Sequence, residues 1–411
     1  MRGELRHRSP GEPLDADQTA APQVRLSVDR SSYEFPVYWI LGLPVQPMTT
    51  SAAMRCIQQA AQTRQRLVFA TPNANFLMLA KQRAAFRENI LRTDLSLADG
   101  MSIVWIGRLL GIPINERVAG SSLMERYLTG SFPELRVFFF GGEDGVAEAA
   151  CARITQSGGS LKGVGWHNPG FGSVEAMSTR EIISKINASG ADILAVSLGA
   201  EKGHAWIERN RDSLQVPVIS HLGATVNFLA GTVKRAPRGM QRAGLEWLWR
   251  VWREPRLAKR YSGDAAHLVR ELVTAVLPLV FRRVVRESGR SQPALNLKLV
   301  AATLLVQGEV TEETLPRLQD FVAGYANRTQ SGLVIDLSGV THIDARALGY
   351  FYELAYRRSA GDVAIRCISA GRVMNRLLTL HRNRGLVERR LAASGVRFKG
   401  PERRVESTRA N

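Results

Sequence analysis

Three short segments of the chain place polar or glycine residues directly after apolar runs: Thr71-Pro72-Asn73, Asp99-Gly100 and Gly141-Gly142. In open α/β sheets, ligands bind at the carboxyl ends of strands, where loops and helix N-termini converge. Backbone N–H groups of the Gly141-Gly142 turn could hold a phosphate or diphosphate there. Each segment also has a structural explanation, since paired glycines form tight turns and aspartate before glycine is common in turns and helix caps. Three such segments on one sheet edge favour a binding site.

A second candidate is the strongly basic stretch of residues 231–290. It contains 14 Lys or Arg and five Asp or Glu, so it carries +9 of the chain's net charge of +18. Its arginines could grip phosphates, and the tryptophans beside them suit single-stranded nucleic acid or a membrane interface with anionic lipid. The same pattern fits a solvated amphipathic helix with Leu245, Leu248 and Val251 facing inward. Composition leaves these alternatives open.

Several catalytic motifs are absent from the sequence. It has no GxxxxGK[ST], HExxH or GxSxG, which disfavours a P-loop nucleotidase, a zinc enzyme and an α/β-hydrolase. The three cysteines, Cys56, Cys151 and Cys367, form no CxxC, so no disulfide scaffold is expected and a reducing cytoplasm is the default. The one DxD, Asp15-Ala16-Asp17, falls in a segment predicted to be disordered. We therefore expect no metal and no other cofactor.

The elements that must position these residues follow from an alternation of short apolar runs with helical stretches. Strands are expected at 66–70, 94–98, 136–140, 193–198 and 216–221, each followed by a helix-like segment. Apolar strands separated by helices and Gly-bearing turns predict a parallel sheet covered on both faces. The predicted fold class is α/β.

The sequence divides into five parts. Residues 1–32 are predicted to be a disordered leader. Residues 33–262 form the α/β domain with its basic C-terminal segment, and residues 263–293 form an amphipathic helix and linker. Residues 294–395 repeat the strand–helix alternation as a small second domain, and residues 396–411 are a polar tail.

No segment of the sequence is predicted to cross a membrane. The apolar run Leu272–Phe281 has ten residues, whereas a spanning helix needs about 20. Pro278 within this run is expected to bend the helix. The N-terminus has no apolar core, so no secretory signal is expected. Contact with a membrane surface stays open.

Seven segments occur in the order found in WecG/TagA/CpsF-type glycosyltransferases. They are TPNANF (71–76), LSLADG (95–100), NERVAG (115–120), FFFGG (138–142), ADILAVSLG (191–199), NFLAGTVKRAP (227–237) and GLEWLWRVWREPRLAKRY (244–261). About residues 35–262 therefore resemble this family. The resemblance implies a Rossmann-like fold. It also implies inverting transfer of a sugar, without a metal, from a UDP-sugar to a saccharide on a polyprenyl diphosphate.

The resemblance also implies roles for individual residues. Asp99 matches the aspartate of the ADG motif, the general base that deprotonates the acceptor hydroxyl. Thr71 and Asn73 match the TPN positions that line the nucleotide-sugar pocket. Arg117 matches an arginine that resembles a phosphate ligand for the leaving UDP.

Further positions complete the implied site. Gly141 and Gly142 would approach the nucleotide, and Lys202 and Asn227 would belong to the UDP-sugar-binding set. Four arginines of the basic segment resemble those that close over the site or meet the lipid diphosphate: Arg235, Arg250, Arg253 and Arg256.

The chain departs from the family pattern near these residues. The common run LGxPKQExW reads LGAEKGHAW here, so Glu201, Gly203 and His204 replace Pro, Gln and Glu, whereas Lys202 is kept. Asn227 stands where an aspartate is usual. Either the donor sugar differs from N-acetylmannosamine or the enzyme is weakened. Retention of the base and the TPN and ERVxG positions favours a different donor.

Residues 294–395 resemble a STAS domain, as found in anti-sigma-factor antagonists. The resemblance rests on GEV (308–310), VIDLSGVTHIDARALGYF (334–351) and the helix that follows ISAGRVMNRLL. Ala345 follows Asp344 at the position where phosphorylated STAS proteins carry Ser or Thr, so no phosphate switch is expected there. Docking of a protein partner, nucleotide sensing and a stabilising appendage all fit.

The leading hypothesis is an enzyme that extends a lipid-linked saccharide for an exopolysaccharide or other cell-surface polymer. It would work in the cytoplasm, peripherally bound to the anionic inner face of the cell membrane through the basic segment and the Leu272–Phe281 helix. The alternative is a catalytically weak scaffold that recruits polysaccharide-assembly partners through the STAS-like domain. Nucleic-acid binding is disfavoured because the chain contains no recognised nucleic-acid module.

Overall fold

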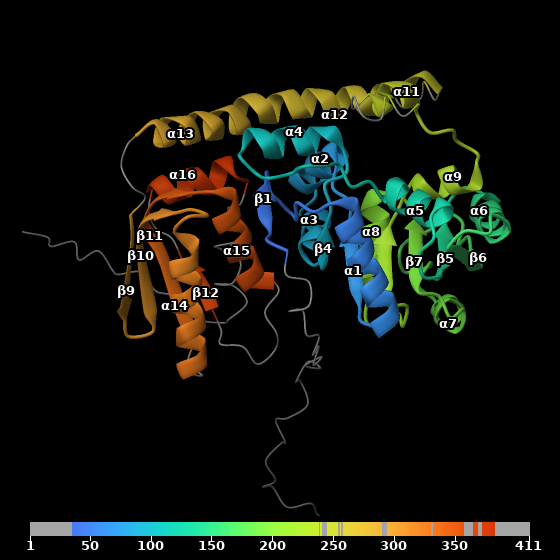
Figure 1. Ribbon diagram of the computed structural model, residues 1–411, viewed down its shortest axis with the longest axis horizontal. Coiled ribbons are helices and arrows are strands. Elements are labelled where there is room, and N and C mark those ends of the chain that lie inside the picture. Colours follow the sequence, from blue (N-terminus) through green and yellow to red (C-terminus); the bar gives the residue numbers. More distant parts are fainter. Residues whose placement is uncertain are drawn as a thin grey trace, which may run out of the picture.

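The structure is a computed structural model that describes residues 35–237, 239–240, 245–253, 255, 258–289, 294–329, 332–356, 365–368 and 372–382. Two α/β units lie side by side beneath a long helical arm (Figure 1). The predicted leader, the polar tail and Arg256 lie outside the described residues.

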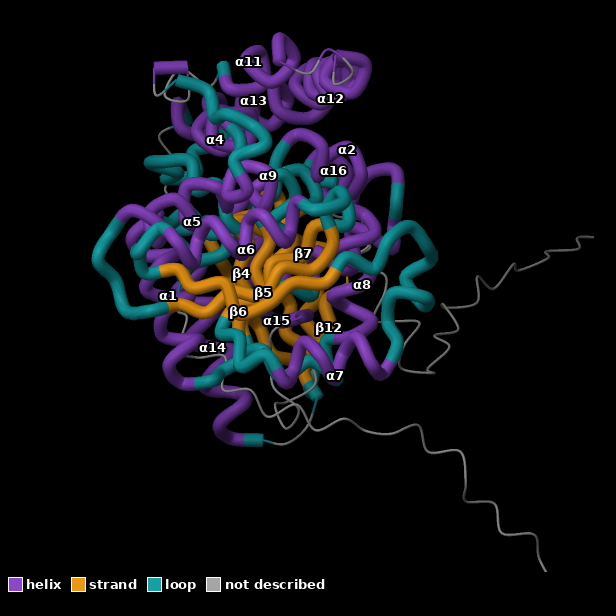
Figure 2. The backbone as a smooth tube through the Cα atoms, turned by 90° about the vertical axis from the view of Figure 1, so that its right-hand side faces the viewer, coloured by secondary structure: helices purple, strands orange, loops and turns teal. Residues whose placement is uncertain are grey.

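The larger unit is built on six parallel strands in the order β4-β3-β8-β7-β5-β6. The strands are β3 (Leu67–Ala70), β4 (Leu95–Ser96), β5 (Leu135–Gly141), β6 (Leu161–His167), β7 (Ile193–Ser197) and β8 (Val218–His221). Every residue of β3 and β8 is buried because helices cover both faces of the sheet (Figure 2). The predicted α/β class with a Rossmann-like parallel core is confirmed.

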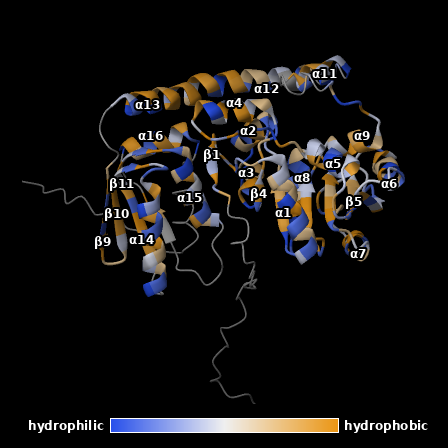
Figure 3. Cartoon of the chain, viewed as in Figure 1, coloured by the Kyte–Doolittle hydropathy of each residue, from blue (hydrophilic) through white to orange (hydrophobic). Residues whose placement is uncertain are grey.

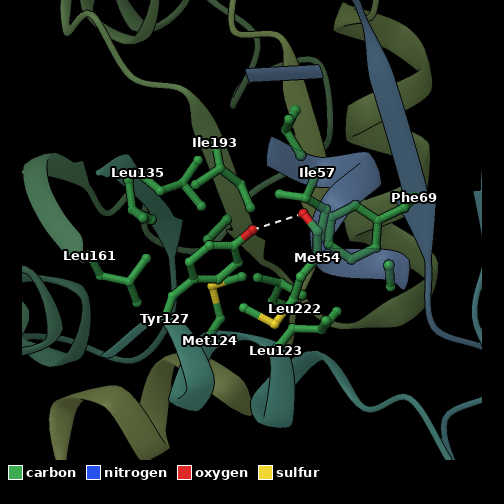
Figure 4. Packing of buried hydrophobic residues seen from close by; sticks show 14 of the residues in the cluster. Met54, Ile57, Phe69, Leu123, Met124, Tyr127, Leu135, Leu161, Ile193 and Leu222 are labelled. Carbon is green, nitrogen blue, oxygen red and sulfur yellow. Dashed lines mark hydrogen bonds between the residues drawn. The ribbon is translucent and has the colours of Figure 1, made fainter. Parts of the chain in front are cut away.

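One face of this sheet is covered by α1 (Thr50–Thr63), α5 (Gly120–Thr129), α6 (Val146–Gln156) and α9 (Thr225–Ala230). Their apolar side chains pack against alternate strand residues such as Phe69 and Ile193. Within this core the Tyr127 hydroxyl donates to the Met54 carbonyl over 3.0 Å (Figure 4). The one polar atom of that buried tyrosine is therefore satisfied.

The opposite face is covered by α7 (Arg180–Ala188) and α8 (Ala200–Asn210). Trp206 of α8 stacks on Phe140 of β5 with ring centroids 4.2 Å apart, and its indole N–H donates to the Met177 carbonyl over 2.8 Å. Helices α2 (Ala74–Gln82), α3 (Ala84–Leu91) and α4 (Met101–Leu109) extend the unit beside the sheet. The helix that carries the altered LGAEKGHAW run is thus fixed firmly to the sheet.

The helical arm consists of four consecutive segments. They are α11 (Glu246–Arg253), α12 (Ala258–Glu271), a π-helical turn (Leu272–Val276) and α13 (Leu277–Ser288). Ala275 and Val276 are fully buried in the same apolar cluster as residues of α2 and α4. Pro278 lies in the first turn of α13, directly after the π-helical turn, so the helical run continues through the proline with a π-helical irregularity beside it.

The smaller unit has a four-stranded sheet in the order β12-β11-β10-β9, with β9 and β10 antiparallel and the other pairs parallel. Its strands are β9 (Leu295–Val300), β10 (Thr303–Val310), β11 (Leu333–Ile343) and β12 (Ile365–Ile368), and its helices are α14 (Leu315–Arg328), α15 (Ala345–Tyr356) and α16 (Arg372–Leu380). The small α/β domain predicted from the sequence is confirmed.

The two units share a continuous hydrophobic core. An antiparallel hairpin of β1 (Tyr38–Ile40) and β2 (Leu43–Val45) packs against α15, and Trp39 and Leu91 belong to the core of the smaller unit. The Trp39 indole N–H donates to the His381 carbonyl over 2.9 Å, and the Tyr352 hydroxyl donates to the Leu91 carbonyl over 2.8 Å. At Gly349, a Cβ would overlap the backbone carbonyl of Val37, directly before β1. The smaller unit is therefore packed tightly onto the larger one.

Candidate active site

Asp99 lies in the loop between β4 and α4, at the carboxyl end of the sheet. Its backbone N–H donates to the Pro72 carbonyl over 2.9 Å, which ties this loop to the one that follows β3. Gly100, with φ +124°, lets α4 begin at once, and a Cβ there would lie 3.2 Å from the Asn73 Cβ. Asn73 caps α2, since its side-chain oxygen accepts from the Phe76 N–H. The ADG and TPN segments thus lie against each other at the carboxyl end of strands β3 and β4.

Thr71 continues that edge toward the centre of the sheet. It is buried beside Gly120, the first residue of α5, where a Cβ would lie 2.8 Å from Leu222 and 3.8 Å from the Thr71 methyl group. Because β3 pairs with β8, this position also adjoins the loop that leads into α9. The start of α5, Thr71 and that loop converge at one point.

Arginines from two distant segments meet beside Asp99. Arg117, from the loop before α5, pairs with Glu246, the first residue of α11, over 2.8 Å. Arg235 lies 4.0 Å from the other oxygen of Glu246, and it also pairs with Glu125. The side chains of Arg117, Arg235 and Glu246 are only 13–15% exposed. The basic segment is therefore anchored over the end of the sheet by ion pairs.

Arg250 of α11 completes this group. Arg250 and Arg235 lie on the ring of Phe228, with their guanidinium carbons 5.5 and 5.9 Å from the ring centroid. The Nε atoms of both arginines are buried and, within the described part of the chain, have no hydrogen-bond partner. Two buried guanidinium N–H groups are thus left without an acceptor among the residues that the structure describes.

The pKa of Asp99 reflects these neighbours. Burial raises it to about 6, the positive charges of Arg117, Arg250 and Arg235 oppose the rise, and the negative charge of Glu246 adds to it. At neutral pH the carboxylate is ionised. A pKa near the working pH suits a group that must accept a proton.

Gly141 and Gly142 lie on the same sheet edge but on β5, three strands from β3. At a strand spacing of about 4.8 Å, this is about 14 Å from the TPN loop. Both have positive φ, +87° and +100°, and a Cβ at Gly141 would lie 2.7 Å from the Ser197 carbonyl oxygen. The Gly142 N–H donates to that same carbonyl over 2.8 Å, so it is already engaged. A close backbone approach explains these glycines.

Other predicted positions have contacts elsewhere. Lys202 on α8 donates to the Gly172 carbonyl over 2.8 Å. Asn227 lies within α9, where its carbonyl accepts from Thr232. Arg253 is exposed at the end of α11. These described contacts give no link between Lys202 or Arg253 and Asp99.

The alternative of a solvated helix with inward leucines is wrong for the described part of the basic segment. Leu245 and Leu248 are 39% and 44% exposed, whereas Arg250 is partly buried against Phe228. Sequence reasoning also missed Glu246 as a member of the site. Its signal was available, since Glu246 is the only acidic residue of α11.

Gly203 and His204, two of the residues that depart from the family pattern, both lie against His221, a residue that the sequence did not single out. A Cβ at Gly203 would overlap the ring of His221, the last residue of β8. His204 lies 5.4 Å from His221 between ring centroids and packs edge-on against Phe76. Burial lowers the pKa of both histidines, that of His221 to about 4, so both rings are neutral. Beneath the strand edge, His221 fills the room that Gly203 leaves.

Comparison with known families assigns the two units. A sequence model of the glycosyl transferase WecG/TagA/CpsF family matches residues 38–280, more than half of the chain. The chain therefore belongs to the WecG/TagA/CpsF family of glycosyltransferases, which confirms the class of enzyme expected from the sequence. A model described as "Mlab, STAS domain" matches residues 294–388 and confirms the STAS resemblance.

Individual proteins resemble parts of the chain. An N-acetylglucosaminyldiphosphoundecaprenol N-acetyl-beta-D-mannosaminyltransferase from Bacillus spizizenii is 29% identical over 212 residues, which is 51% of this chain and 78% of the relative. Among solved structures, an anti-sigma factor antagonist from Mycobacterium paratuberculosis is 20% identical and covers 22% of this chain and 80% of its own, with a TM-score of 0.18.

Proposed function

We propose that this enzyme transfers a sugar from a UDP-sugar to a saccharide carried on a polyprenyl diphosphate, with inversion and without a metal. The observation that carries the proposal is the set of three arginines, Arg117, Arg235 and Arg250, whose charges act on the buried carboxylate of Asp99. A base for an acceptor hydroxyl and cations for diphosphates are the groups that such a transfer needs. The name of the Bacillus spizizenii relative includes a diphosphoundecaprenol-linked sugar, which supports the acceptor class.

In the proposed reaction, Asp99 takes the proton of the acceptor hydroxyl as its oxygen attacks the anomeric carbon of the donor. The new carbon–oxygen bond forms on the face opposite UDP, and the bond to the diphosphate oxygen breaks, so the configuration inverts. Arg117 stabilises the charge that develops on the leaving UDP. Arg235 and Arg250, with their unpartnered N–H groups, bind a diphosphate by charge-assisted hydrogen bonds.

The remaining predicted residues would hold the donor along the sheet edge. Thr71 and Asn73 lie next to Asp99 and are proposed to line the sugar pocket. Gly141-Gly142, Lys202 and Asn227 are proposed to lie toward the nucleotide end, and Arg253 and Arg256 toward the lipid diphosphate. The packing of Gly203 against His221 supports a donor other than N-acetylmannosamine. The family pattern has a glutamine at position 203, and here the His221 ring fills the space that such a side chain would need.

We propose further that the arm lies on the anionic inner face of the cell membrane. Val269, Val273, Leu277 and Phe281 are exposed and recur every fourth residue, and apolar residues are frequent along the arm (Figure 3). In a regular α-helix the first and last of them would lie about 120° apart, since each residue turns 100°. The extra residue of the π-helical turn reduces this to about 20°. One apolar stripe therefore runs along the outer side of the arm.

Neighbouring groups support the same surface. Trp105 and Leu109 of α4 are 49% and 45% exposed beside the arm, and Trp252 of α11 is 68% exposed. Exposed basic side chains of the arm include Lys259 and Arg270. Aromatic and basic residues together favour a lipid headgroup region that carries negative charge. Among the described helices, every one is too short or too polar to traverse a bilayer.

We also propose a protein partner for the STAS domain. Such a partner would have to bind a face of the domain that the larger unit does not cover. The β1–β2 hairpin covers α15, but β9 is an edge strand with Leu299 and Val300 exposed. An exposed edge strand can pair with a strand of another chain.

The test is UDP release from a panel of UDP-sugars with a polyprenyl-diphosphate-linked saccharide in liposomes, for the wild type and Asp99→Asn, with and without EDTA. We expect acceptor-dependent release that resists EDTA and is lost in the variant. Binding of UDP without release from any donor would favour the scaffold alternative. Absence of UDP binding would contradict the proposed function. The acceptor saccharide that supports UDP release would then identify the polymer, either an exopolysaccharide or another surface polysaccharide.

A further inference from the structure

Glu246 places a negative charge on the arginines that are proposed to bind the diphosphate groups of the substrates. Its carboxylate lies 2.8 Å from Arg117 and 4.0 Å from Arg235, two of the three arginines around Asp99. Carboxylates and phosphates accept hydrogen bonds from the same guanidinium groups, often in the same bidentate manner. The ion pair described for Arg117 is the one with Glu246. In this structure, Glu246 therefore occupies the place on Arg117 that a substrate phosphate would take.

A diphosphate on Arg117 and the Glu246 carboxylate in its present position are electrostatically incompatible. The group already contains two carboxylates, Asp99 and Glu246, against the three arginines, and Glu125 pairs with Arg235 as well. The Glu246 and Arg117 side chains are largely buried, so solvent screens their neighbours weakly. A diphosphate that docks here must displace the carboxylate or suffer repulsion from it.

The same carboxylate fastens α11 over the site. Among the described residues of α11 none is buried, so the helix contributes little apolar packing. Its described attachments include the Glu246–Arg117 pair, Arg250 on Phe228, and the Trp249 indole N–H, which donates to the Lys234 carbonyl over 3.1 Å. An element with few buried contacts opens at low cost. The ion pair is thus one of the contacts that hold α11 against the larger unit.

We propose that Glu246 is an internal stand-in for the substrate diphosphate: it holds α11 over the site by its ion pair with Arg117 and is exchanged for that diphosphate when substrate binds. This inference rests on the proposed function, because it names a regulating contact of the same site. The exchange couples movement of the arm's first helix to the arrival of a diphosphate. Arg117 is neutralised by Glu246 before binding and by the diphosphate afterwards.

The experiment compares the wild type with Glu246→Gln and with the matched control Glu208→Gln. Glu208 pairs with Arg92 over the same 2.8 Å, but on α8 and α3. Binding of UDP and of inorganic pyrophosphate is measured by calorimetry, and amide hydrogen exchange of α11 is measured without ligand. In Glu246→Gln we expect about fivefold to tenfold tighter binding of both ligands and faster exchange in α11. The control should change neither.

Two results would overturn this proposal. Weaker binding of pyrophosphate and UDP by Glu246→Gln would make Glu246 a positioning residue that holds Arg117 ready for the ligand. Unchanged affinity, or unchanged exchange in α11, would mean that the carboxylate neither competes with the ligand nor closes the helix. Failure of the proposed function has a different signature, since the wild type would then bind no UDP and transfer no sugar, while exchange in α11 is read without any ligand.

Discussion

At the scale of single residues, the proposed chemistry depends on the Asp99 carboxylate, on whose ionisation burial and the neighbouring arginines act in opposite directions. Burial makes ionisation of Asp99 costly, whereas Arg117, Arg235 and Arg250 make it favourable, and the pKa settles at about 6. A carboxylate with an ordinary pKa would be a weaker proton acceptor. In the proposed reaction, burial therefore strengthens the base, whereas the arginines keep it ionised at neutral pH and bind the substrate phosphates.

Replacing Asp99 by Asn should lower the transfer rate by about 10²- to 10⁴-fold, the usual contribution of a general base. UDP binding should stay within a few-fold of the wild type, because the amide keeps the shape of the side chain. In the wild type, kcat/KM should rise as the pH passes through about 6 and then level off, since the base must be deprotonated. Steady-state rates between pH 5 and 8 test this. A profile that is flat across this range would contradict the assignment of Asp99.

Glu246→Gln should move the acidic limb of the same profile to lower pH. The negative charge of Glu246 raises the pKa of Asp99, so its removal leaves the arginines with more influence and lowers that pKa. The pH dependence of kcat/KM for this variant and for Glu208→Gln provides the measurement. We expect a shift only in Glu246→Gln. A limb that moved to higher pH would show that Glu246 acts on Asp99 by another route.

At the scale of elements, the altered LGAEKGHAW run is explained by packing between α8 and β8. Gly203 has no side chain, and the His221 ring lies in the space that a Cβ would take. The two positions are 18 residues apart and belong to different elements. They form one unit, so a change at either depends on the residue at the other.

Gly203→Gln should therefore destabilise the protein by about 1–3 kcal/mol, the usual cost of overpacking. His221→Gly should also destabilise it, because it leaves a cavity beside His204. The double variant should lose less than the sum of the two, since the glutamine then has room. Urea unfolding of the three variants gives the free energies. Additive losses would mean that the two positions do not share one space.

The arm offers a second prediction at this scale. Val273→Ser combined with Phe281→Ser removes two members of the exposed apolar stripe without touching a buried residue. Binding to vesicles that contain anionic lipid should fall by about tenfold or more, since each buried apolar side chain contributes about 1.5–3 kcal/mol. Leu299→Ser, also exposed but on β9, is the control and should bind normally. Sedimentation with vesicles measures both, and equal binding by all three proteins would contradict a lipid-facing arm.

At the scale of the whole molecule, a buried acid joins three parts of the chain. Glu271 of α12 is almost fully buried, pairs with Lys81 of α2, and accepts from Arg382, which follows α16, over 2.9 Å. Arg382 also donates to Thr274 in the π-helical turn over 3.1 Å. The transferase unit, the arm and the STAS domain thus meet at one carboxylate. Together with the hairpin that packs on α15, this fixes the STAS domain to the enzyme.

Glu271→Gln should lower the free energy of unfolding at pH 7 by about 1–3 kcal/mol, because charge-assisted hydrogen bonds to both cations are lost. Burial tends to raise the pKa of Glu271, but Lys81 and Arg382 hold it below its ordinary value of 4.5. Its contribution is complete above that value and disappears as the pH falls through the lowered native pKa. The difference in unfolding free energy between the two proteins should therefore narrow as the pH falls below 4.5. A difference that did not narrow with falling pH would show that the charge is not responsible.

The sequence by itself determined the fold class, the strand-end loops and the presence of two α/β units. Strands β3, β5 and β7 are largely apolar runs, and such runs are a local signal that can be recognised without tertiary contacts. The hairpin β1–β2 and β6 went unpredicted, because the hairpin strands have three residues each and β6 contains two glycines. Short or glycine-bearing strands give too little periodicity to identify.

The tertiary structure alone decided which residues meet. Arg117 and Glu246 are 129 residues apart, and nothing in either local sequence specifies that they form an ion pair. The packing of Gly203 on His221 and the junction at Glu271 depend in the same way on how distant elements are brought together. Periodicity and turn chemistry act over a few residues, whereas charge pairing and the filling of space act between whatever the fold makes adjacent. For that reason the sequence could propose Asp99 as the base through the family resemblance, and it could not predict the contacts that shift the pKa of Asp99.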